Sequence, residues 1–220
     1  MIPFKINGTR YNVPTEWSDV TFKQYVALLS LPDTLLSKIH LFTGIPLGVL
    51  QTAELKNLEK ISIALAFLTI SPKFEAAPTR LVGPYVMPQD VTIKWLAQFE
   101  DLKKLILKVP KKELKEFEVE DHEILADLYL QACAIYCQKV RDTDYNYMKS
   151  LEMLDELRGY SCLEIIQTGS FFLFRPVNLS QSTPRRFPNI RQRLKRWIQG
   201  LPGYRKTLEF MLPSSGSHEK

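Results

Sequence analysis

The sequence has few of the residues from which metal sites and enzyme centres are built. It contains only three His and three Cys among 220 residues. His122 and Glu123 begin the segment HEILA, but Ala126 stands where the metal-binding motif HExxH requires its second His. Cys133 and Cys137 are spaced to share one face of a helix, and a zinc site would need further ligands. We interpret these two cysteines as small buried apolar side chains.

The loops that bind phosphate or calcium are missing as well. The segment GIPLGVL lacks the Lys-Ser/Thr pair of a phosphate-binding loop, and Ser161 lacks the second flanking Gly of a nucleophile elbow. Asp142, Asp144 and Asn146 alternate like the start of an EF-hand loop, but the required Gly and Glu do not follow. We interpret His40 as a structural residue of an amphipathic helix. The sequence therefore predicts that the protein is not an enzyme and uses no cofactor or metal.

Long hydrophobic runs are also absent. The longest apolar run, at residues 61–70, is too short to span a bilayer, and the N-terminus lacks the charged-then-apolar layout of a signal peptide. We therefore expect a cytoplasmic protein. Apolar residues make up 45% and charged residues 24% of the chain, which is typical of a globular protein. A length of 220 residues suits one domain with a small appendage.

The first 32 residues carry strong local signals. Asn7-Gly8 stands between two apolar-alternating runs, which predicts a type I′ hairpin with strands at residues 4–6 and 9–13. Thr21 and Gln24 have the spacing of a capping box. They predict a helix that begins after Thr21 and ends before Pro32.

Apolar residues at helical spacing predict a mainly α fold for the rest of the body. The proline-rich segment 71–88 interrupts this pattern, and we interpret it as a loop or as a second short hairpin that pairs with the first. Asp142 or Thr143 is expected to cap the helix that follows it. The predicted helices cover residues 33–42, a short stretch near 46, 56–68, 90–109, 121–140, 143–158 and 160–174. Gly44 is expected to end the first of these helices.

Charge divides the chain into two parts. Residues 1–174 carry 19 Lys and Arg against 22 Asp and Glu, whereas residues 175–220 carry 10 against 2. We therefore predict a helical body at 1–174 with an N-terminal hairpin, and a basic C-terminal extended arm at 175–220. The arm would comprise an extended linker, a short helix at 189–199 and a disordered end. Such a division indicates a charged partner for the arm.

The stretch from Thr183 to Lys206 holds eight basic residues and no acidic one. Drawn as a helix, its centre places Ile190, Leu194, Trp197 and Ile198 on one face, with the basic side chains mostly on the others. We predict that this arm binds a partner. The predicted partner-binding residues are Arg185, Arg186, Ile190, Arg191, Arg193, Leu194, Lys195, Arg196, Trp197, Arg205 and Lys206.

Four interpretations of the arm remain open. It can dock in an acidic groove of another protein with its apolar face inward. It can contact the phosphates of nucleic acid, although no known DNA-binding fold accompanies it. It can lie on a membrane surface, for which its apolar face is short. It can also pack back on the acidic body of its own chain. An extended linker that leads to an anchor helix is typical of proteins in large assemblies, which favours the first.

Two parts of the chain resemble known phage proteins. The opening FKINGTRYNVPTEWSDVTFKQYVAL and the later FTGIPLGVLQTAELKNLEKISIALAFL resemble small bacteriophage tail-assembly and virion proteins. The second half, with MPQDVTIKWLAQFEDLKKLI and AIYCQKVRDTDYNYMKSLEMLDELRGYSCLEIIQTGSFFLF, is similar to proteins from phages of gut Bacteroidetes, including crAss-like phages. The resemblance covers roughly residues 4–174 and leaves out the arm. Its landmarks are Trp17, Gln24, Gln98, Phe171 and Phe172.

The resemblance implies a non-enzymatic phage protein. It would be a structural component of the particle at the neck or tail, or an assembly factor that escorts such a component. Its partners would be other phage structural proteins in an oligomeric assembly, in the virion or the host cytoplasm, with no membrane contact. The alternative function is a nucleic-acid-binding module that uses the Arg-rich arm.

Overall fold

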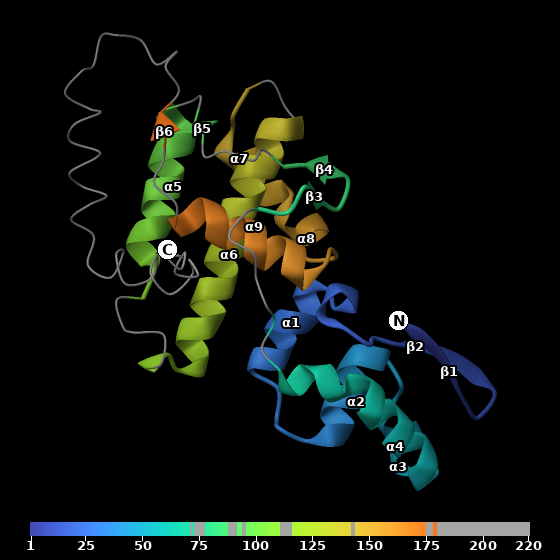
Figure 1. Cartoon of the computed structure of the whole chain (residues 1–220). Coiled ribbons are helices and arrows are strands. Elements are labelled where there is room, and N and C mark those ends of the chain that lie inside the picture. The colour runs from blue at the N-terminus through green and yellow to red at the C-terminus, as the bar shows by residue number, and fades with distance from the viewer. Residues whose placement is uncertain are drawn as a thin grey trace, which may run out of the picture.

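The computed structural model describes residues 1–70, 72, 78–87, 92–93, 96–110, 116–141, 144–174 and 178–179. These residues form a mainly helical fold with small two-stranded sheets, which confirms the predicted fold class. The elements before residue 70, blue to teal in Figure 1, lie at one end of the molecule. The helices from residue 96 to residue 174 form the other end.

The N-terminal hairpin forms as the sequence predicts. Strand β1 (Ile2–Ile6) pairs antiparallel with β2 (Thr9–Val13), and Ile6 faces Thr9 across the turn. Asn7 and Gly8 have φ values of 48° and 83°, the positive values that a type I′ turn requires. Ile6 and Val13 are buried, so the last residue of each strand attaches the hairpin to the core.

Helix α1 (Phe22–Leu29) begins with the predicted capping box. The Thr21 hydroxyl accepts a hydrogen bond from the Gln24 backbone, and the Gln24 side chain accepts one from the Thr21 backbone. Around this cap the Phe22 amide donates to the Tyr160 carbonyl at 2.8 Å. The Cys162 amide donates to the Val20 carbonyl, also at 2.8 Å. The start of α1 therefore joins the two ends of the molecule.

The remaining elements of the first 70 residues follow the predicted order. Gly44, with a φ of 70°, ends the second helix in the left-handed conformation that favours glycine. The predicted helix at 56–68 is confirmed, although its last turns are a 3₁₀-helix. These elements are η1 (Trp17–Asp19), α2 (Leu35–Thr43), α3 (Leu47–Gln51), α4 (Leu55–Ala64) and η2 (Leu65–Thr69).

A second short hairpin lies in the proline-rich segment. Strand β3 (Leu81–Val82) pairs antiparallel with β4 (Tyr85–Val86). Among the described residues it pairs with itself and not with the first hairpin. The reason is its position against the C-terminal helices, where β3 contacts α9 (Cys162–Phe174) and β4 contacts α6 (Val119–Arg141).

The C-terminal end is organised around α6. This helix contacts α9, α1, α5 (Leu96–Lys108), α7 (Tyr147–Glu152) and α8 (Leu154–Leu157). A Cβ added at Gly169 on α9 would lie 2.3 Å from the Tyr129 carbonyl oxygen on α6, so the two backbones approach closely. The rings of Tyr136 and Phe172 stack nearby with centroids 3.4 Å apart. Close packing of α6 on α9 thus forms the centre of the core.

Two helix predictions need correction. The helix predicted at 90–109 begins only at Leu96, because Thr92–Ile93 forms a strand, β5, that pairs in parallel with β6 (Asn178–Leu179). β-branched residues favour strands, and this part of the predicted helix is rich in them. The helix predicted at 143–158 is two helices, α7 and α8, with Met153 between them.

The N-cap of α7 also differs from the prediction. The cap is Asn146, whose side-chain oxygen accepts a hydrogen bond from the Met148 amide at 2.9 Å. Its backbone is extended, with a φ of −141°, as an N-cap requires. The expected capping residues, Asp142 and Thr143, lie outside the described residues. The alternating acidic segment is therefore the approach to a helix.

Candidate interaction surface

The partner-binding residues predicted from the sequence all lie in the arm. Arg185 to Lys206 are outside the residues that the structure describes, so their role stays a prediction. The same holds for the boundary between body and arm at residue 174. Any observed chemistry that suits a basic amphipathic partner or a substrate therefore lies in the described body.

The histidines of the body make structural contacts. The Nδ1 atom of His40 lies 2.8 Å from the Ile45 carbonyl oxygen, which confirms the structural interpretation of this residue. The exposed ring of His122 lies edge-on to Phe117 with centroids 5.5 Å apart. Neither contact brings a histidine to a nucleophile or a carboxylate.

The cysteines are buried and free, as the sequence predicts. The sulfur atoms of Cys133 and Cys137 are 3.9 Å apart, and that of Cys137 lies 3.6 Å from the sulfur of Met87. The hydrogen bond to Cys137 and burial together raise the pKa of the Cys133 thiol well above its usual value. Burial raises the pKa of Cys162 to about 12. Thiols with such pKa values stay protonated at neutral pH and act as small apolar side chains.

Metal-binding chemistry is likewise missing from the part of the chain that the structure describes. No group of three or more His, Cys, Asp and Glu side chains is close enough there to hold a metal ion. No helix in the same part is long and apolar enough to cross a membrane.

A buried polar cluster joins α7 to α5 and α6. The Asp101 carboxylate on α5 accepts hydrogen bonds from the Tyr145 hydroxyl at 3.0 Å and from the Lys104 ammonium at 2.8 Å. The Gln138 side-chain oxygen on α6 accepts bonds from the Ser150 hydroxyl at 2.8 Å and from the Asn146 amide at 3.2 Å. Burial and the hydrogen bond to Asp101 raise the pKa of Tyr145. These contacts use the polar groups to hold helices together.

Gln98 on α5 differs from Gln138, of whose two side-chain polar atoms only the nitrogen lacks a described partner. The Gln98 side chain is fully buried, and neither its oxygen nor its nitrogen has a hydrogen-bond partner among the described residues. An unpaired buried amide costs roughly 1–3 kcal/mol. Gln98 was a landmark of the sequence resemblance, but its burial could not be foreseen from the sequence.

The second hairpin is fixed to the body by two carboxylates. The Gly83 amide donates to the Glu164 carboxylate at 3.0 Å, and the Tyr85 hydroxyl donates to the Glu156 carboxylate at 3.1 Å. Tyr160 also donates to Glu156, and this hydrogen bond raises the pKa of its hydroxyl. Glu156 and Glu164 therefore have structural partners, and their charges are already used within the body.

The first half of α6 presents a different kind of surface. Residues 116–138 contain no Lys or Arg, and six carboxylates lie between residues 116 and 127. Two apolar side chains among them reach solvent, Val119 at 53% and Ile124 at 46% exposure. We call this set the acidic α6 surface. It consists of Glu116, Glu118, Val119, Glu120, Glu123, Ile124 and Asp127.

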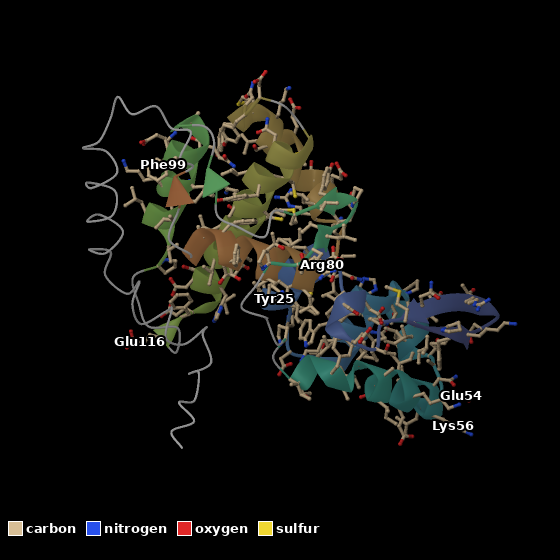
Figure 2. The ribbon with its side chains drawn as sticks, turned by 45° about the horizontal axis from the view of Figure 1, so that its top comes forward. Tyr25, Glu54, Lys56, Arg80, Phe99 and Glu116 are labelled. Atoms are coloured by element: carbon tan, nitrogen blue, oxygen red, sulfur yellow. The ribbon has the colours of Figure 1, made fainter. Side chains whose placement is uncertain are left out.

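The acidic α6 surface lies far from the exposed apolar side chains of α4. Figure 2 shows Glu116 at one end of the view, and Glu54 and Lys56 beside α4 at the other. On α4 the exposed apolar side chains Leu55 and Ile63 stand among charges of both signs. Around Val119 and Ile124, by contrast, the charged side chains on α6 are all acidic up to Gln138.

Comparison with known proteins adds no relative. The chain matches no protein-family model, no curated protein and no solved structure.

Proposed function

We propose that the protein is a non-enzymatic component of a phage particle, at its neck or tail, or an assembly factor for such a component. It acts by protein–protein interaction within an oligomeric assembly, in the virion or the host cytoplasm. Its basic arm docks on a partner subunit made of phage structural protein. The observation that carries this proposal is the division of charge: 19 basic and 22 acidic residues in 1–174, against 10 and 2 in 175–220.

The chemistry of the arm supports docking on a protein. Ile190, Leu194 and Trp197 share one face of the predicted helix, beside Arg191 and Arg193. Trp and Arg are enriched among the residues that contribute most to protein–protein binding. The resemblance of residues 4–174 to phage tail-assembly and virion proteins agrees with this function.

Nucleic-acid binding is the second candidate. The eight basic residues between Thr183 and Lys206, with no acidic residue among them, suit contact with phosphates. In that case the charges of the arm would bind phosphates without a contribution from the apolar face. Trp197 is therefore expected to be essential for docking on a protein and dispensable for nucleic-acid binding.

The test compares Trp197→Ala with Arg193→Ala in a pull-down of assembly partners. We expect Trp197→Ala to weaken partner binding more, by about 2 kcal/mol or roughly 30-fold, because truncating a desolvated aromatic anchor removes a hot spot. Arg193→Ala removes one of several charges and should have a smaller effect. In a parallel titration we expect random-sequence DNA to bind only at about micromolar levels or more weakly near physiological salt.

Three results together would favour nucleic-acid binding over docking on a protein. DNA binding would be tight and would weaken steeply with salt, it would be lost when the arginines are replaced, and it would be unchanged by Trp197→Ala. A mass-spectrometric inventory of purified particles separates the two forms of the proposal. A stable copy number supports a component, and absence from the particle supports an assembly factor.

A further inference from the structure

The acidic α6 surface has the layout of one side of a helix–helix contact. Glu120, Ile124 and Asp127 are spaced i, i+4 and i+7, so they lie on one face of α6 with Ile124 between two carboxylates. Val119 and Glu123 border this face. An exposed apolar residue framed by carboxylates fits a partner helix that has an apolar face bordered by cations.

The helix dipole explains only some of these carboxylates. Glu120 and Asp121 lie in the first turn of α6, where negative charge stabilises a helix. The backbone amide of Glu118 donates to Asp121 at 3.0 Å, so Asp121 also helps to cap the helix. Glu123 and Asp127 lie beyond the reach of this effect, which falls off within the first turn. The Asp127 carboxylate also accepts a hydrogen bond from the Gln131 side chain, a neutral donor that leaves its negative charge in place.

The position of α6 leaves this face accessible. The buried side of its first half, with Leu125 and Ala126, turns toward the core, and α6 contacts α1. The start of α6 projects beyond the end of α5 at the bottom of Figure 1. Val119 and Ile124 accordingly keep about half of their surface in solvent, at 53% and 46%.

The arm of the same chain is chemically complementary to this surface. As the predicted helix, residues 189–199 would place Ile190, Leu194 and Trp197 on one face, and they carry four cations at 191, 193, 195 and 196. The acidic α6 surface offers the opposite charge, with its carboxylates on one side of the exposed Ile124.

The arm is also long enough. Strand β6 ends at Leu179, beside β5 and at the start of α5. Nine residues, 180–188, separate it from the predicted helix and can span about 30 Å when extended. Helix α5 has 13 residues and is about 20 Å long. The predicted helix can therefore reach the acidic α6 surface of its own chain.

We propose that residues 189–199 bind the acidic α6 surface of the same chain when no partner is present. Ile124 meets the apolar face that contains Trp197, and Glu120, Glu123 and Asp127, which lie to one side of Ile124 on α6, face the arginines. A short linker gives such a contact a high effective concentration, about millimolar. A partner subunit must then offer a better surface to draw the arm away. The inference deepens the proposed function, because it treats the arm as a protein-docking segment.

The test is the rate at which trypsin cuts the full-length protein at Arg191, Arg193, Lys195 and Arg196, followed by mass spectrometry. The variant carries Glu120→Gln, Glu123→Gln and Asp127→Asn, which remove charge from the body and leave every cleavage site intact. We expect cleavage of the arm to become roughly ten-fold faster, since several exposed ion pairs are lost together. Ile124→Ser should accelerate it independently of charge. Raising the salt from about 50 mM to about 500 mM should accelerate cleavage of the unaltered protein but not of the triple variant.

A matched control removes three carboxylates elsewhere: Glu59→Gln, Asp144→Asn and Glu152→Gln, all at exposed positions. It should leave the cleavage rate unchanged, and circular dichroism should show the same helix content for both triple variants. A second pair of changes, Glu123→Arg with Asp127→Arg, should free the arm, and adding Arg191→Glu with Arg193→Glu should protect the remaining sites again. If the unaltered arm is cut as fast as that of the triple variant at low salt, the proposal is wrong.

Protein concentration identifies the copy that supplies the surface. Protection that stays constant over about a 100-fold dilution supports binding within one chain, because effective concentration does not change. Protection that disappears on dilution would contradict binding within one chain and would indicate that a second copy of the protein supplies the surface. The outcome is separable from the proposed function. If the partner pull-down depends on Trp197 but the free arm is not protected from trypsin, the proposed function is supported and this inference is wrong. If the arm is protected but no partner is found, this inference is supported and the proposed function is not.

Discussion

The first 70 residues and the helices at 96–174 differ in the contacts that stabilise each region internally. All the polar and charged side chains that are buried among the described residues lie between Gln98 and Ser170. In the first 70 residues the buried core side chains are apolar, such as Val13, Phe22 and Ile39. The second region therefore depends on specific hydrogen-bond partners, whereas the first depends on burial and on local turns and caps.

The two regions also differ in how far apart in the sequence their contacting residues lie. The capping box of Thr21 and Gln24 and the Asn7-Gly8 turn involve neighbours in the sequence. By contrast, the hydrogen bond from Tyr145 to Asp101 joins residues 44 positions apart. Gly169 meets Tyr129 from another helix. Substitutions should therefore act locally in the first region and across several helices in the second.

The largest expected effect is that of Gly169→Val. The new side chain would meet the Tyr129 backbone, where a Cβ lies 2.3 Å from the carbonyl oxygen, so α6 and α9 must separate. We expect a loss of about 3 kcal/mol or more in the free energy of unfolding, measured with urea. Gly48→Ala is the control from the first region, because nothing lies within 4 Å of a Cβ there. It should be neutral or slightly stabilising in α3. Equal effects would contradict close helix packing.

A smaller effect is expected for Gly8→Val in the first hairpin. Gly8 has a φ of 83° and open space around it, so the cost comes from backbone strain alone. We expect the free energy of unfolding to fall by roughly 1–3 kcal/mol. Gly8→Asn should cost less, because Asn tolerates this conformation better than a β-branched residue does. An unchanged melting temperature for Gly8→Val would mean that the hairpin contributes nothing to stability.

The smallest effects come from a pair of buried amides and should have opposite signs. Gln138→Met removes the acceptor of Ser150 and Asn146, which should cost about 1–2 kcal/mol. Gln98→Met removes an amide without a described partner and should raise stability by about 1 kcal/mol. Met preserves length and helix propensity in both. Urea unfolding checks both variants, and a loss at Gln98 as large as that at Gln138 would show that the Gln98 amide is paired.

The sequence predicted the first region better than the second, for a physical reason. The type I′ turn, the capping box and the Gly44 helix end each depend on a few adjacent residues, and all three are observed. The errors fall where distant segments meet. Thr92–Ile93 leaves the predicted helix to pair with β6. Helix α7 begins after its N-cap Asn146, whose backbone amide donates a hydrogen bond to the Gln138 side chain.

The candidate surface was predictable only in part. The basic arm and its apolar face follow from the order of residues, and so does the run of carboxylates at 116–127. The side of α6 that remains exposed does not, because helical spacing fits several orientations. Packing on α1 and α9 leaves Val119 and Ile124 in solvent while Leu125 and Ala126 are buried.

Local sequence features account for the helical class, the first hairpin, the caps that start α1 and end α2, and the division of charge between residues 1–174 and 175–220. These features depend on backbone preferences and charge, which belong to short segments. The packing of the second hairpin on α6 and α9, the burial of Gln98 and Gln138, and the exposure of one acidic face of α6 depend on the tertiary structure. Those outcomes depend on which distant surfaces bury each other, and burial is a property of the whole fold.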